Sequence, residues 1–215
     1  MFKKILFISF IISAMTPIAQ SNAQTVQGEY RLKGGFEMVA AFYFDSNHTF
    51  KFYYAYGASD RQATGTYKIA GGKVILHGSK LPGRDFTVLH QKQEGGGTTI
   101  KITDNNPVLV QSVFCMFIKG EEKDIQYSDH EGIAHSAMTG CDTIFVMHRM
   151  FPDILTTVKY KDSSNKNNYF ELALNPSLAE VCFKDFEMTI DKDTLSGSMP
   201  YLFEKEKSFF VKQQP

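Results

Sequence analysis

The chain has 215 residues, and its 23 basic and 23 acidic side chains give a formal net charge of zero at pH 7. That balance, without a long basic run, argues against nucleic acid or an acidic membrane surface as the main partner. Aromatic residues make up 13% of the chain, all of them Phe or Tyr, and these residue types favour β-strands.

The first residues have the three regions of a secretory signal peptide. Two lysines precede an apolar run at residues 5–14, and Ser21 and Ala23 stand before a cleavage site at Gln24. The apolar run is shorter than the ~20 residues that a membrane-spanning helix needs. We therefore expect residues 1–23 to be removed, the mature chain to lack a transmembrane segment, and the protein to be periplasmic or extracellular.

Short strand-like segments separated by turn residues follow. In the first half, strands are expected at residues 29–32, 38–44, 49–56, 64–69, 73–77, 86–91 and 98–102. Because side chains alternate across a strand, one face of the third segment is strongly aromatic. That face carries Phe50, Phe52, Tyr54 and Tyr56.

Residues 103–107, with two Asn and a Pro, mark the expected boundary between two domains. Beyond it, strands are expected at residues 109–119, 124–127, 133–138, 143–147, 155–160, 169–174, 187–190 and 209–212. Residues 176–183 are the best helix candidate, because a proline starts them. This density of strands predicts an all-β protein, with an antiparallel meander or partial barrel at residues 24–106 and a β-sandwich at residues 107–215.

The first half spaces its glycines and aromatics in a regular cadence. The cadence runs through "GEY" (28–30), "HTF" (48–50), "YGASDRQATGTY" (56–67) and "GGKVIL" (71–76). Over about residues 28–90 it resembles the lipocalin-like meander domains of exported bacterial proteins. That resemblance implies a family that includes carriers of apolar molecules.

The second half carries a different set of motifs. They are "FIKG" (117–120), "SDHEGIAHSAM" (128–138) and "NYFELALNP" (168–176). They resemble transthyretin-like or carboxypeptidase-regulatory-like β-sandwiches, and an Ig-like sandwich is the related alternative. The resemblance implies an accessory module without catalytic residues.

The aromatic strand and the loop after it form the candidate ligand site. Tyr54 and Tyr56 could stack on a sugar or an apolar ligand, with Asp60 and Arg61 forming hydrogen bonds at its rim. In the structural alternative, which we favour, the aromatic row is the core face of a strand. Asp60 and Arg61 would then be a solvated pair that contributes ~0–1 kcal/mol.

Three cysteines, Cys115, Cys141 and Cys182, lie in the second half. In an exported chain, one disulfide with one thiol left over is expected, and Cys141–Cys182 is the first choice. Three buried, reduced cysteines acting as small apolar residues are an equally weighted alternative.

Nothing in the sequence indicates a metal, a cofactor or an elbow motif for nucleophilic catalysis. Asp129, His130, Glu131 and His135 are types that could bind a metal, but their pattern favours a turn between strands. A hydrolase built around His90 or His130 remains an alternative.

The combined expectation is an exported, non-enzymatic binding or scaffolding protein. Its partner would be a small apolar molecule, a glycan or another envelope protein, and no nucleic acid. A small-molecule carrier that uses the aromatic face of the first domain is the alternative within the binding class.

Overall fold

The computed structural model describes residues 25–34, 37–199 and 207–214. The expected signal peptide therefore lies outside the described residues. Within this part of the chain the fold is all-β, as the sequence predicts, with sixteen strands and a single short 3₁₀ helix, η1 (Pro176–Ala179). The expected helix at 176–183 is thus limited to one turn.

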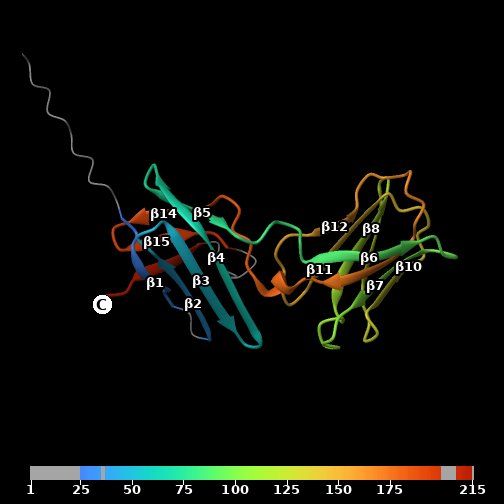
Figure 1. Ribbon diagram of the computed structural model, residues 1–215, viewed down its shortest axis with the longest axis horizontal. Coiled ribbons are helices and arrows are strands. Elements are labelled where there is room, and N and C mark those ends of the chain that lie inside the picture. The colour runs from blue at the N-terminus through green and yellow to red at the C-terminus, as the bar shows by residue number, and fades with distance from the viewer. Residues whose placement is uncertain (1–24, 35–36, 200–206, 215) are drawn as a thin grey trace, which may run out of the picture.

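Eight strands form a closed barrel, in the order β1-β16-β15-β14-β5-β4-β3-β2 with antiparallel pairs (Figure 1). Its strands are β1 (Gly28–Leu32), β2 (Met38–Phe44), β3 (Thr49–Tyr56), β4 (Ser59–Ala70), β5 (Lys73–Gly78), β14 (Phe186–Asp191), β15 (Thr194–Gly197) and β16 (Ser208–Lys212). Closure leaves no open sheet edge in the barrel, which removes a common route to aggregation.

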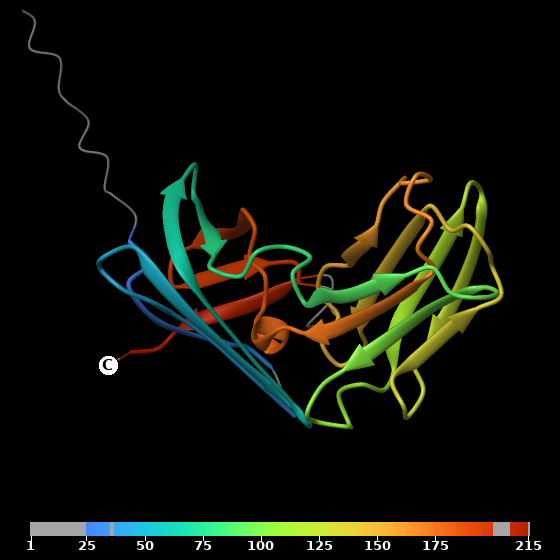
Figure 2. The ribbon, with the colours of Figure 1, turned by 45° about the vertical axis from the view of Figure 1, so that its right-hand side comes forward.

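The other eight strands form two four-stranded sheets, ordered β10-β7-β13-β6 and β12-β11-β8-β9. They are β6 (Phe86–Lys92), β7 (Thr98–Thr103), β8 (Val113–Lys119), β9 (Glu122–Tyr127), β10 (Ile133–Ser136), β11 (Thr143–His148), β12 (Thr156–Lys159) and β13 (Tyr169–Leu174). The pair β13–β7 is parallel, and the other pairs in these sheets are antiparallel. The sheets lie beside the barrel in both views (Figures 1 and 2).

The strand pairing differs from the expected division at residue 107. β6 and β7 precede that point but belong to the four-stranded sheet β10-β7-β13-β6, whereas β14 to β16 follow it and complete the barrel. The two sheets are therefore inserted between β5 and β14 of the barrel. Local patterns could not indicate this, because β1 pairs with a strand at the other end of the chain, Tyr30 opposite Lys212.

Two separate hydrophobic cores correspond to this arrangement. The barrel core includes Tyr30, Phe42, Phe44, Leu76 and Phe210, all with at most 1% of their surface exposed. The second core receives apolar side chains from both four-stranded sheets, which identifies them as a face-to-face sandwich. In the described part of the chain, no helix has the length and apolarity needed to cross a membrane.

Candidate functional site

The aromatic row of β3 points into the barrel. Phe50, Phe52 and Tyr54 are buried, and only Tyr56, at the end of the strand, is exposed. The ring of Phe52 lies 4.6 Å from the ring of Phe42 and 5.2 Å from that of Phe183, measured between centroids. Three of the four aromatics predicted to share a face therefore belong to the barrel core.

Phe183 comes from the connection that returns from the sandwich to the barrel. Its ring contacts Phe50 at 5.7 Å, Phe42 at 5.7 Å and Phe186 at 5.3 Å, so it lies in the middle of the barrel aromatics. Only 1% of Phe183 is exposed. Around Phe183, the protein's own aromatic side chains therefore occupy the barrel interior.

Arg61 is buried, which corrects the interpretation of Asp60 and Arg61 as a solvated pair. β4 begins at Ser59, so the two residues are neighbours on one strand and face opposite sides. Asp60 is exposed, whereas Arg61 is 2% exposed. The structure therefore separates the two polar side chains that the sequence placed together at a ligand rim.

Arg61 belongs to a buried charged cluster where the barrel meets the sandwich. Its Nη2 lies 3.4 Å from Asp153 Oδ2 and donates to the carbonyl of Glu180 at 3.0 Å. Lys80 Nζ lies 2.7 Å from Asp85 Oδ1 and donates to the same carbonyl at 2.7 Å. Two cations thus face two carboxylates, and the formal charges of these four side chains sum to zero.

This cluster joins four segments of the chain. Asp153 comes from the loop between β11 and β12, and its Oδ2 accepts a hydrogen bond from the Cys182 amide at 2.8 Å. Lys80 and Asp85 lie on the outgoing connection, and the Asp85 amide donates to Thr156 Oγ1 of β12. Burial raises the pKa of Asp85, and the bond from Lys80 opposes that effect. The cluster is therefore the joint between the barrel and the sandwich.

A second group of tyrosines lies on the outer wall of the barrel. The register places Tyr43 opposite Lys51, and Ala41 opposite Tyr53. The two tyrosines are thus diagonal neighbours across β2 and β3, a geometry in which aromatic side chains can reach each other. They are 50% and 48% exposed, and the sequence alone does not indicate that they lie together.

A hollow of about 280 Å³ opens between these rings and is the candidate site. We call it the tyrosine hollow. Apart from backbone portions of inward-facing residues, it is lined by Glu29, Ala41, Tyr43, Lys51, Tyr53, Gln62 and Thr64. Ala41 leaves space because its side chain is short. The rim supplies a carboxylate, an ammonium, an amide and a hydroxyl, which together can donate and accept hydrogen bonds.

The two histidines considered for catalysis, His90 and His130, are both exposed on the surface of the sandwich. His90 is exposed on β6 and stands opposite Glu171 of β13. His130 is in the turn that the sequence predicts, where Asp129 Oδ1 accepts the amides of Glu131 and Ile133 at 2.9 Å each. In the described ranges, no group of three or more His, Cys, Asp or Glu is arranged to hold a metal ion.

The expected Cys141–Cys182 disulfide is not formed; all three cysteines are buried free thiols. Cys141 lies in the sandwich core, where its Sγ is 3.4 Å from Thr98 Oγ1. Cys182 is at the joint, and its Sγ is 3.4 Å from the carbonyl of Lys80. The three cysteines therefore match the alternative in which they act as small, buried apolar residues. Burial also raises the pKa of the Cys115 thiol to about 12.

The fold and the site define an all-β protein with a closed eight-stranded barrel, an inserted sandwich and a tyrosine-flanked hollow on the barrel wall. In comparisons with known proteins, no family model matches the chain, and neither does any curated protein.

Proposed function

We propose that this chain is an exported, non-enzymatic binding protein that holds a glycan in the tyrosine hollow. One observation carries the proposal: Tyr43 and Tyr53, both about half exposed, flank the short side chain of Ala41 within a polar rim. A sugar ring has a matching character, because its C–H face is apolar and its edge carries hydroxyls. Aromatic rings with polar tips suit such mixed surfaces.

The size of the hollow supports a small or partial occupant. Its volume of about 280 Å³ is close to the lower end of ordinary small-molecule sites, roughly 300–1,000 Å³. A few sugar rings could lie along the wall, with their hydroxyls reaching Gln62 and Thr64 of β4 and Lys51 of β3. A large apolar ligand would exceed this volume.

The packed interior favours the outer wall over an internal carrier site. Phe183 occupies the centre of the barrel aromatics, and Phe42, Phe50 and Phe52 surround it. An apolar ligand in this part of the interior would have to displace these side chains. The closed barrel is compatible with the lipocalin-like resemblance, and the sandwich would serve as an accessory unit beside it.

A panel of immobilised oligosaccharides tests the binding part of this proposal. We expect the wild-type chain to bind at least one of them, and Tyr43→Ala and Tyr53→Ala to weaken binding tenfold or more, about 1.4 kcal/mol. Tyr160→Ala is the matched control, because Tyr160 is 58% exposed but lies beyond β12 on the sandwich. Equal binding by all four proteins would contradict the site, and absence of binding to any glycan would contradict the ligand class.

Export has its own test. In the producing cell, the mature protein should be recovered outside the cytoplasm with Gln24 as its first residue, because the signal-peptide pattern ends there. Recovery of the uncleaved chain in the cytoplasm would contradict this part of the proposal.

A further inference from the structure

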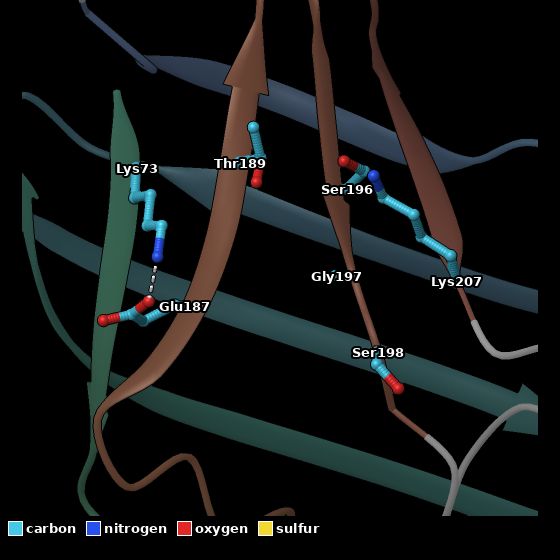
Figure 3. Close-up of a pocket in the computed structure, with 7 residues that line it drawn as sticks. All are labelled: Lys73, Glu187, Thr189, Ser196, Gly197, Ser198 and Lys207. Atoms are coloured by element: carbon cyan, nitrogen blue, oxygen red, sulfur yellow. Dashed lines mark hydrogen bonds and ion pairs between the residues drawn. The ribbon is translucent and has the colours of Figure 1, made fainter. Parts of the chain in front are cut away.

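A second hollow lies on the opposite part of the barrel wall, over β5, β14, β15 and β16 (Figure 3). It has a volume of about 380 Å³ and is lined by Lys73, Glu187, Thr189, Ser196, Gly197, Ser198 and Lys207. We call it the lysine hollow. It shares no residue with the tyrosine hollow.

The strand register explains why the wall is hollowed here. Lys73, Thr189, Ser196 and Phe209 lie side by side across the four strands. Thr189 and Ser196, in the middle of this row, have short side chains, while Lys73 and Phe209 at its ends have long ones. The hollow is therefore a shallow trough with hydroxyls on its floor and long side chains at its sides.

The charges in the hollow do not cancel. Lys73 Nζ pairs with Glu187 Oε2 at 2.6 Å, so this lysine and this carboxylate neutralise each other. Lys207 forms no ion pair with any residue that the structure describes; its ammonium lies 5.6 Å from the centre of the Phe209 ring. Figure 3 shows its side chain running toward Ser196. One positive charge thus stands over the hydroxyls without a described counter-charge.

We propose that the lysine hollow binds an oxyanion: a carboxylate, sulfate or phosphate group of a small ligand. Lys207 would donate a charge-assisted hydrogen bond, which is stronger than a neutral one. The hydroxyl of Ser196, which lies beside the Lys207 ammonium in Figure 3, can donate a further bond to the same group. The Lys73–Glu187 pair closes one side of the trough and adds no net repulsion. This proposal rests on the lysine hollow alone and does not depend on glycan binding in the tyrosine hollow.

Backbone amide NMR of the full mature chain at neutral pH tests the proposal. Sodium phosphate, sodium sulfate and sodium acetate are titrated separately, with sodium chloride holding the ionic strength constant. We expect at least one of the three oxyanions to give saturable shifts in residues 187–198 and 207–209. Saturation by phosphate or sulfate would assign a tetrahedral group, and saturation by acetate a carboxylate.

Two lysine variants decide where the anion binds. Lys207→Gln should weaken the saturable binding at least tenfold, because it removes the only described charge in the hollow that is not in an ion pair. Lys92→Gln is the control, since Lys92 is an exposed lysine paired with Glu94 on the sandwich. No saturable shift beyond that of chloride, or equal binding by Lys207→Gln and wild type, would overturn the proposal.

Discussion

The two faces of β3 carry similar residues and have different roles. Phe50, Phe52 and Tyr54 point inward and are buried, whereas Tyr53, between them in sequence, points outward and is 48% exposed. The inner rings pack against Phe42 and Phe183, and the outer ring flanks the tyrosine hollow with Tyr43. An aromatic run in a strand can therefore supply both a core and a binding surface, one residue apart.

The largest expected effect is on the inner face. Phe52→Ala should lower the free energy of unfolding by about 3–5 kcal/mol, because it removes a buried ring from a close-packed core. Denaturant unfolding measures this loss. A loss below about 1 kcal/mol would mean that the inner face is not packed as described, and would restore the carrier alternative.

The next largest effect on stability is expected at the joint. It tests whether Arg61 is held in a buried charged cluster while its neighbour on β4, Asp60, is not. Asp153→Asn should cost about 3 kcal/mol, because it removes a buried negative charge that faces Arg61 and Lys80. Asp60→Asn changes an exposed carboxylate next to Arg61 in sequence, and it should leave stability within about 0.5 kcal/mol of wild type. If the two variants unfolded alike, the buried cluster would not be the joint.

Acidification should lower the stability of the sandwich by protonating His148, which is fully buried. Its Nε2 donates to the Leu109 carbonyl at 3.0 Å, and its Nδ1 accepts the Met150 amide, so the neutral ring satisfies both nitrogens. Burial lowers the pKa of His148 below its usual 6.5. Because the pKa is lowered in the folded state, the contribution of neutral His148 to the free energy of unfolding is complete above pH 6.5. It is lost as the pH falls through the folded-state pKa.

Unfolding midpoints at pH 7.5 and pH 5.0 measure this dependence. The wild-type chain should lose stability on acidification, and His148→Gln should lose less, because it has no imidazole to protonate. An identical loss in both proteins would show that another group is responsible.

A smaller effect on stability is expected on the outer face than on the inner face. Tyr53→Ala removes a half-exposed side chain from a strand, so it should lower the free energy of unfolding by about 1 kcal/mol, the size of strand-propensity and cross-strand-pair effects. Circular dichroism and the unfolding midpoint check this. A loss comparable to that of Phe52→Ala would make Tyr53 a structural residue and remove the reason to place a ligand there.

The strands were largely predictable because period-two alternation is a local property. The strand at residues 38–44 matches β2, and that at 49–56 matches β3. β15 was missed because Thr194, Ser196 and Gly197 give it little apolar alternation. The polar start of β4 at Ser59 also lacks apolar alternation, so the sequence predicts a loop there.

The long-range arrangement could not be predicted from these patterns. Barrel closure depends on β1 pairing with β16, and the burial of Arg61 depends on Asp153, which is distant in sequence. The tyrosine hollow depends on the register between β2 and β3, which sets Tyr43 beside Tyr53. Each of these features arises from contacts between segments, which a single sequence does not record.

Tyrosine nitration, mapped by peptide mass analysis of the native full chain, tests most directly whether the two faces of β3 differ as described. Tyr43 and Tyr53 should be nitrated readily, while Tyr54 and Tyr67, both 5% exposed, should react only after unfolding. A native protein in which Tyr54 reacts as fast as Tyr53 would contradict the account.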